Sequence, residues 1–243
     1  MTAPILIFGA RGGIGEALAR RLAASGYPLV LASREPDRLG ELAAETGAAT
    51  VACDALDGDS IRQAVADAAT DEGLAGLAYC IGSIVLKPFK GATESDFIDC
   101  YRLNTVGAAL AVQAAAPALR KANGAVVLFS TVAAGQGFGN HTVIAAAKGG
   151  TEALTRSMAV DLAPDVRVNC IAPSISRTEL AEKLLSNEKM AEGLAASHPL
   201  QRIGEPDDSA AMAAFLLGPD AGWITGQVFP VDGGRGALRT RGQ

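Results

Sequence analysis

Cysteine is scarce in this sequence, and its placement gives no sign of metal or disulfide chemistry. The four cysteines, Cys53, Cys80, Cys100 and Cys170, form no Cys-x-x-Cys pair and no spacing typical of a zinc site. Three of them end apolar runs that are typical of buried strands. We therefore expect reduced, buried thiols and no bound metal.

Long hydrophobic runs and a large excess of charge are also lacking. No segment reaches the roughly 20 apolar residues that a membrane span needs, so no membrane partner is expected. Only 19% of the 243 residues are charged, and the formal net charge is −5, which gives no general attraction to nucleic acid. The chain begins with an apolar run and no basic leader, so we expect a cytoplasmic protein.

The chain instead contains a regular alternation of short apolar runs with longer amphipathic stretches. In the first amphipathic stretch, Ile14, Leu18 and Leu22 recur at helical spacing. Most apolar runs lack polar alternation, as expected for parallel strands covered on both faces. We predict one α/β domain over residues 1–243, a doubly wound Rossmann-type sheet of about seven parallel strands with helices on both faces. The predicted strands are Ile5–Phe8, Leu29–Ala32, Thr50–Cys53, Leu77–Ile81, Val126–Phe129, Val166–Ile171 and Val228–Val231.

One segment, Arg177–Pro199, interrupts the alternation between the last two predicted strands. It is rich in Glu, Lys, Ser and Ala with Leu at intervals, which indicates a helical insertion. Ligands of open α/β sheets bind beyond the carboxyl ends of the strands, so this segment is placed to cover a small-molecule substrate. We expect Ser83–Lys90 and Gly135–Thr142 to complete the pocket.

A glycine-rich turn follows the first predicted strand. Its sequence, Gly9-Ala-Arg-Gly-Gly13-Ile-Gly15, has the spacing Gly-x-x-x-Gly-x-Gly. Glycines there let the backbone approach a pyrophosphate, which the N-terminus of the next helix stabilises. A turn of this kind can also be purely structural. Its position at the start of a β-α-β array favours dinucleotide binding.

The end of the second predicted strand, Ser33-Arg34, bears on the choice of dinucleotide. An acidic residue there binds the ribose hydroxyls of NAD, whereas an arginine suits the 2′-phosphate of NADP. Arg11 in the glycine turn supplies a second positive charge. The alternative is that Asp37 binds the ribose and Arg34 is an ordinary solvated charge. We favour NADP(H) over NAD(H).

Together with segments further along, these motifs resemble the short-chain dehydrogenase/reductase family over nearly the whole chain. The resemblance is carried by the glycine turn, Asp54, Cys80-Ile-Gly82, Asn104, Pro173-Ser-Ile-Ser-Arg-Thr178, and Trp223-Ile-Thr-Gly-Gln227 through Asp232-Gly-Gly234. Within the family, the sequence resembles members of the 3-oxoacyl-acyl-carrier-protein reductase type. The resemblance implies hydride transfer between NADP(H) and a small carbonyl or alcohol. The implied cofactor contacts are Gly9, Arg11, Gly13, Ile14, Gly15, Ser33, Arg34, Asp54, Ala55, Gly82, Asn104, Lys148, Pro173, Ile175 and Thr178.

The sequence departs from the family at its chemistry. Family members carry Tyr-x-x-x-Lys, a spacing that places both side chains on one helix face. Here Lys148 is present, but Ile144 stands where the tyrosine would be, and isoleucine cannot transfer a proton. The family's substrate-orienting serine corresponds to Thr131, with Ser130 beside it. The resemblance implies that Lys148 binds the ribose hydroxyls and that Asn104 holds a water or backbone link to Lys148.

The only two histidines, His141 and His198, differ in their expected roles. His141 lies three residues before Ile144, where an imidazole suits proton transfer at neutral pH. The alternative is that it only lines the pocket or caps the helix. His198 is expected at the surface. None of the three tyrosines, Tyr27, Tyr79 and Tyr101, is placed to replace the missing one.

Two functions stay open from sequence alone. The first is an NADP(H)-dependent oxidoreductase with Asn104, Ser130 or Thr131, His141 and Lys148 around the site. The second is a catalytically silent NADP(H)-binding protein that acts as a sensor or partner subunit. The family resemblance implies a homotetramer, with a dimer as the fallback. Small residues would let helices of two subunits pack closely; they are Ala108, Ala109, Ala114, Ala115 and Ala116.

Overall fold

The protein is built on one parallel sheet. The computed structural model describes residues 3–239, and its seven strands run in the order β3-β2-β1-β4-β5-β6-β7. This order confirms the predicted doubly wound sheet. Strands β2 and β3 follow one another outward from β1 on one side, and strands β4 to β7 follow one another outward on the other side. The strands are β1 Ile5–Phe8, β2 Leu29–Ser33, β3 Ala49–Ala52, β4 Gly76–Tyr79, β5 Ala125–Phe129, β6 Arg167–Pro173 and β7 Val228–Val231.

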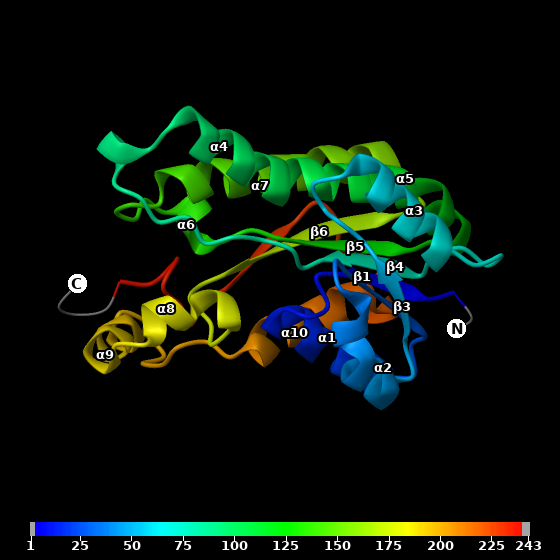
Figure 1. Ribbon diagram of the computed structural model, residues 1–243, viewed down its shortest axis with the longest axis horizontal. Coiled ribbons are helices and arrows are strands. Elements are labelled where there is room, and N and C mark those ends of the chain that lie inside the picture. The colour runs from blue at the N-terminus through cyan, green and yellow to red at the C-terminus, as the bar shows by residue number, and fades with distance from the viewer. Residues whose placement is uncertain (1–2, 240–243) are drawn as a thin grey trace.

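Helices cover both faces of this sheet, as Figure 1 shows. In that view α3, α4, α5 and α7 lie above the sheet, and α1, α2 and α10 lie below it, with α8 and α9 on the same lower side beyond the strand ends. Among the described helices, none combines the length and the apolar character that a bilayer crossing requires. The helices are α1 Gly13–Ala24, α2 Gly40–Thr46, α3 Gly58–Ala68, α4 Glu94–Tyr101, α5 Gly107–Ala122, α6 Val132–Gly135, α7 Thr142–Leu162, α8 Glu182–Leu185, α9 Glu188–Ala196 and α10 Pro206–Leu217.

The core consists of two apolar layers, one on each face of the sheet, and β1 contributes to both. Leu6 and Phe8 pack with the α3, α5 and α7 side, whereas Ile5 and Ile7 pack with the α1 and α10 side. All four side chains are fully buried. Successive residues of a strand point to opposite faces, so a strand buried on both sides must be apolar throughout.

The centre of the sheet is also where the order of building reverses. Strand β1 pairs with β2 on one side and with β4 on the other, and the β1–β4 register ends at Phe8 and Tyr79. Strand β4 therefore stops two residues before Ile81, where the sequence had suggested its end. The segments that follow β1 and β4 lead to helices on opposite faces of the sheet (Figure 1). Open α/β sheets bind ligands in the crevice between two such segments.

The segment between β6 and α10 is helical in part and is tied to the sheet. It contains a 3-10 turn, Glu179–Ala181, followed by α8 and α9. His198, just after α9, is only 1% exposed, so the expected surface position is wrong. Its Nδ1 donates to the Leu194 carbonyl at 2.7 Å, and its Nε2 accepts from the Ser174 hydroxyl at 2.7 Å. The imidazole thereby fastens α9 to the carboxyl end of β6.

The small residues of α5 do not all serve the role that their size suggested. Ala108 and Ala115 are fully buried against the sheet, in the same core layer as Leu6 and Phe8. They therefore bring α5 close to its own sheet and are not available to a second subunit. Small size alone does not distinguish packing on the sheet from packing between subunits, because both require the helix to approach its neighbour closely.

Candidate functional site

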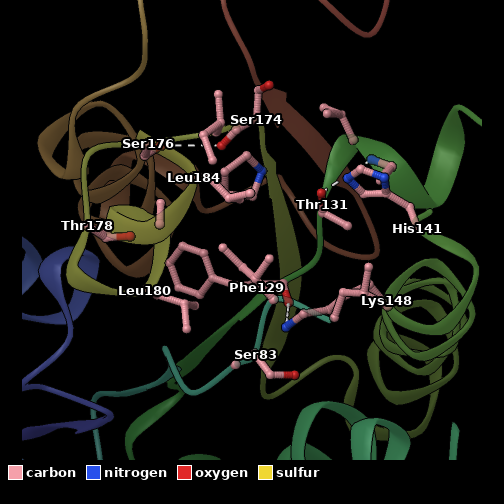
Figure 2. Close-up of a pocket in the computed structure, with 18 of the residues that line it drawn as sticks. Ser83, Phe129, Thr131, His141, Lys148, Ser174, Ser176, Thr178, Leu180 and Leu184 are labelled. Carbon is pink, nitrogen blue, oxygen red and sulfur yellow. Dashed lines mark hydrogen bonds between the residues drawn. The ribbon is translucent and has the colours of Figure 1, made fainter. Parts of the chain in front are cut away.

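A pocket of about 320 Å³ lies beyond the carboxyl ends of β4, β5 and β6. Figure 2 shows side chains from several elements pointing into it, among them Lys148 from α7, Thr131 after β5, and Ser174 after β6. The helical segment after β6 forms one wall, through Leu180, Leu184, Met190 and Leu194. Most of the other lining residues fall in the expected loops or follow the strands: Cys80, Ile81, Gly82, Ser83, Ile84, Leu86, Phe129, Ser130, Val132, Ala133, Phe138, His141, Ile144, Pro173, Ile175, Ser176 and Thr178.

The backbone of the glycine turn is tightly packed and leaves room for a ligand close to it. Gly9 has φ +75°, and a Cβ added to Gly15 would lie 2.4 Å from the Gly9 carbonyl oxygen, so no larger residue fits at Gly15. The N-cap of α1, Gly12, makes no side-chain capping bond. The first N–H groups of α1, at Gly13, Ile14 and Gly15, therefore remain available to an anion.

Three arginines surround the end of β2 next to this turn. Glu35 lies between two of them, with its Oε2 at 3.0 Å from the Arg38 Nε and 4.0 Å from the Arg11 Nη1. Arg34 is exposed, and within residues 3–239 its guanidinium has no ion pair or hydrogen bond. The cluster carries three positive charges against one negative charge, so it suits a phosphate group. The sequence analysis had not assigned a role to Arg38.

The other expected cofactor contacts lie around the same edge of the sheet. Asp54 is exposed after β3, and its Oδ1 accepts the Leu56 N–H at 2.9 Å. Thr178 faces the glycine turn, because a Cβ added to Gly13 would lie 3.0 Å from its methyl carbon. The remaining predicted contacts flank these positions: Ser33 ends β2, Ala55 is buried beside Asp54, and Pro173 and Ile175 line the pocket.

Lys148 holds a positive charge at the buried side of the pocket. Its side chain is 6% exposed, and its Nζ donates to the Phe129 carbonyl at 2.7 Å. Burial lowers the pKa of this amine to about 8, because a charged ammonium is poorly solvated there. Figure 2 shows the amine directed toward the end of β5.

Asn104 is held beside Lys148 by an irregular turn of helix. It lies in a π-helical turn, Arg102–Val106, between α4 and α5. Its Nδ2 donates to the Cys100 carbonyl at 2.8 Å and to the Ser83 hydroxyl at 2.9 Å. A Cβ on Gly82 would lie 3.2 Å from the Asn104 Oδ1 and 3.3 Å from the Lys148 Nζ. The lack of a side chain at Gly82 therefore leaves room for the Asn104 Oδ1 and the Lys148 Nζ beside it.

The two neighbouring hydroxyls after β5 are used differently. Ser130 is buried, and its Oγ donates to the Glu152 carboxylate at 2.8 Å, so its single hydrogen is directed away from the pocket. Thr131 Oγ1 accepts the Ala133 N–H at 3.3 Å and keeps its own hydrogen. This geometry favours Thr131 over Ser130 as a donor to a bound oxygen.

His141 lines the same pocket from the start of α7. Its Nδ1 lies 2.6 Å from the Gly139 carbonyl oxygen, and its ring packs against Phe138 with the ring centroids 5.6 Å apart. A carbonyl can only accept, so Nδ1 carries a hydrogen and Nε2 is the nitrogen left for proton exchange. The arrangement therefore leaves the His141 Nε2 as a nitrogen in the pocket that can exchange a proton.

The position one helical turn before Lys148 is apolar. Ile144 is 5% exposed and lines the pocket. In the described chain, none of the three tyrosines lines it. Tyr79 is buried, and its hydroxyl donates to the Leu103 carbonyl at 2.9 Å, while Tyr101 is 46% exposed on α4.

Comparison with known proteins agrees with this fold. The family described as enoyl-(acyl carrier protein) reductase matches residues 9–235. The chain belongs to the short-chain dehydrogenase/reductase family. The human dehydrogenase/reductase SDR family member 2, a mitochondrial protein, is 32% identical over 238 residues, which are 94% of this chain and 84% of that relative. The 3-oxoacyl-acyl-carrier-protein reductase MabA from Mycobacterium tuberculosis is 30% identical over 235 residues, 96% of this chain and 92% of MabA.

Solved structures of other short-chain dehydrogenases/reductases superpose over almost the whole chain. Levodione reductase has a TM-score of 0.91 at 29% identity and covers 98% of both chains. ElxO with NADP bound has a TM-score of 0.90 at 25% identity and covers 98% of this chain and all of ElxO. The relatives' names describe oxidoreductases, and the family uses nicotinamide cofactors.

The buried amine of Lys148 makes the stability of the protein depend on pH. The folded state has a lysine pKa of about 8, whereas the unfolded chain has the ordinary value of about 10.4. Between these values the unfolded chain binds more protons, so the free energy of unfolding rises with pH, by up to roughly 3 kcal/mol. We expect urea unfolding of the cofactor-free protein to show this rise between pH 8 and pH 10, relative to a Lys148→Met variant. Equal pH dependence in the two proteins would show that the amine is not desolvated.

Proposed function

We propose that this protein is an NADP(H)-dependent oxidoreductase that interconverts a small carbonyl compound and its alcohol at an atypical active site. The supporting observation is the convergence of Lys148, Thr131 and His141 on one pocket beside the glycine turn. These groups provide a cation, a hydrogen-bond donor and a proton carrier. A purely structural pocket needs none of them.

The chain's residues fit NADP(H) on both charge and space. The absence of a Cβ at Gly15, the uncapped start of α1 and the partnerless Arg34 suit the pyrophosphate and the 2′-phosphate. We assign Asp54 to the adenine end of the cofactor and Lys148 to its nicotinamide ribose. When bound, the cofactor supplies or accepts hydride. In this proposal, protein side chains orient the substrate and supply the proton.

In the proposed reaction, Thr131 orients the substrate oxygen and His141 exchanges its proton. During reduction the protonated imidazole gives the Nε2 hydrogen to the developing alkoxide, while its Nδ1 stays hydrogen-bonded to the Gly139 carbonyl. During oxidation the neutral imidazole takes the hydroxyl proton at the same nitrogen. The positive charge of Lys148 stabilises the developing negative charge from the buried side.

A second candidate function rests on Ile144. This buried side chain places a hydrocarbon where the family's phenol stands, so the position one helical turn before Lys148 cannot exchange a proton. The alternative is therefore a catalytically silent protein that binds NADP(H) and acts as a sensor or partner subunit. The variants described below separate the two functions.

Arg34 decides the cofactor preference in this proposal. We expect NADPH to bind more tightly than NADH, and Arg34→Asp to reverse the order by lowering NADPH affinity about 10- to 100-fold, the usual worth of a charge-assisted hydrogen bond. Fluorescence titration measures both affinities. Lys121→Asp, at an exposed position at the end of α5, is the matched control for the change in charge and should leave the order intact. Equal affinities in the unmutated protein would refute the preference.

His141 decides the proton donor. We expect His141→Ala to lower turnover of a carbonyl substrate about 10²- to 10⁴-fold, because a general acid is lost. Its affinity for NADPH should stay within about twofold, since the imidazole faces the substrate side of the pocket. Steady-state kinetics and NADPH titration on the same preparation supply both readings. An unchanged rate would assign the proton to a water near Asn104 and Lys148 instead.

Ile144→Tyr tests whether only the acid was lost. The variant restores a phenol one helical turn before Lys148. A protein that is silent because of Ile144 should gain NADPH-dependent carbonyl reduction, whereas an enzyme that uses His141 should already be active and change little. Because Ile144 is 5% exposed, the added hydroxyl should also lower the thermal midpoint. Both proteins need the same carbonyl panel and the same melting assay.

We also propose a homotetramer, with a dimer as the fallback. Large apolar side chains remain exposed on the outer helices and near β7, with Ile98 54%, Val160 77% and Trp223 100% exposed. Covering them would remove apolar surface from water. Light scattering at micromolar concentration should give the mass of four chains. A monomer would overturn the proposal.

The state of the cysteines supports the cytoplasm as the proposed location. The four cysteines are free thiols in the structure, and three of them are buried. Burial raises the pKa of Cys80 and Cys170 to about 12, so these thiols are unreactive at neutral pH. Inert, unpaired thiols suit a reducing compartment.

A further inference from the structure

The turn after β7 contributes an arginine to the pocket, a role that the sequence did not indicate. The Asp232 carboxylate accepts the N–H groups of Gly234 at 2.8 Å and Gly236 at 2.5 Å. The Gln136 side chain donates to the Gly236 carbonyl, which ties the turn to the segment after α6. Within this braced turn, Arg235 points its side chain into the lining of the pocket.

The Arg235 guanidinium makes no direct contact with an anion in the described part of the chain, and the Asp232 carboxylate acts on it only through its charge. The guanidinium lies 4.6 Å from the centroid of the Phe138 ring, and it makes no ion pair or hydrogen bond within residues 3–239. The nearest carboxylate, Asp232, is already used by two backbone N–H groups. By contrast, Arg120 and Arg202 each bind a carboxylate, at 2.8 Å and 2.6 Å. Partial burial lowers the pKa of Arg235, but an arginine remains protonated at neutral pH.

The remainder of the pocket offers this cation no counter-charge. Its lining contains no aspartate or glutamate among the described residues, and the other fixed cation, Lys148, already donates to the Phe129 carbonyl. The wall formed by the segment after β6 is apolar. A partly desolvated guanidinium in an apolar pocket is favourable mainly when an anion arrives with the ligand.

Arg235 lies near the end of the pocket that holds Thr131 and His141. Phe138 contacts both the Arg235 guanidinium, at 4.6 Å, and the His141 ring, at a centroid distance of 5.6 Å. A Cβ on Gly236 would lie 3.5 Å from the Val132 side chain, next to Thr131. A ligand oxygen at Thr131 and His141 is therefore only a short carbon chain away from Arg235.

We propose that the substrate is a short oxo acid or the corresponding hydroxy acid, with its carboxylate on Arg235 and its apolar carbons along the pocket wall. This inference rests on the proposed oxidoreductase function. One planar guanidinium matches one carboxylate through two parallel hydrogen bonds. A phosphate carries close to two charges at neutral pH and would need a second cation, which this end of the pocket lacks.

Kinetics with a matched pair of substrates test the role of Arg235. A short oxo acid and its neutral amide differ only in the charged group. Arg235→Leu should lower kcat/KM for the acid about 10- to 100-fold and leave that for the amide within about twofold, while Arg235→Lys should keep part of the preference for the acid. Arg239→Leu, four residues further on at an exposed position outside the pocket, should change neither value. An equal loss for acid and amide in Arg235→Leu would overturn the inference.

A binding measurement separates this inference from the proposed reaction. Calorimetry with hexanoate and hexanamide, with and without NADPH, requires no turnover. Hexanoate should bind at least about 10-fold more tightly than hexanamide to the unmutated protein and to Arg239→Leu. Arg235→Leu should bind the two compounds with equal affinity. If this preference is found but no carbonyl compound is reduced, the anion site stands and the proposed reaction fails. If hexanamide binds as tightly as hexanoate, the carboxylate site is refuted. Tighter binding of inorganic phosphate than of hexanoate would refute it in favour of a phosphate ligand.

Discussion

The hydrogen bond from the Lys148 amine to the Phe129 carbonyl joins the longest helix of the site to the end of a central strand. At 2.7 Å it fixes where α7 lies against β5, and it places a positive charge at the buried side of the pocket. Gly82 lies beside this amine and beside the Asn104 side chain, because a Cβ on Gly82 would lie 3.3 Å from the Lys148 Nζ and 3.2 Å from the Asn104 Oδ1. The amine tolerates burial because it retains this acceptor, although burial still lowers its pKa to about 8. The groups proposed for the reaction are arranged around this amine.

Around that amine, the pocket combines polar groups with an apolar position on α7. Ile144 lies one helical turn before Lys148, and the His141 imidazole lines the pocket just before α7 begins. Phe138 then links this imidazole to the Arg235 guanidinium through ring contacts on both sides. In the proposed reaction, the buried side of the pocket binds the cofactor, and the outer side carries the groups that meet the substrate.

Much of this architecture follows directly from local sequence patterns. Strands β1 and β7 have their predicted bounds. In β1 the reason is that an uninterrupted apolar run, buried on both faces, leaves little choice of boundary. The end of β4 was predicted two residues too late, since Ile81 continues the apolar run but belongs to the pocket lining. Ala108 and Ala115 were predicted to face another subunit but pack on the sheet, because residue size does not encode direction.

The site was predictable where a residue acts through its immediate neighbours and not where distant segments meet. Lys148 and Asn104 follow from motif spacing, and the choice of Thr131 over Ser130 required the contact with Glu152, which comes from another turn of α7. His198 looked like a surface residue, yet it bonds to Ser174, 24 residues away. Arg235 gave no sequence signal, because its role depends on Phe138, about a hundred residues earlier in the chain and brought near by the sheet.

The most direct test of the account is a crystal structure of the protein with NADP⁺ and an unreactive analogue of the substrate. The account predicts that the analogue's oxygen lies within hydrogen-bond distance of both the Thr131 Oγ1 and the His141 Nε2, and that Ile144 makes only apolar contacts. An oxygen held instead by water on Asn104 and Lys148, with the His141 ring turned out of the pocket, would contradict it.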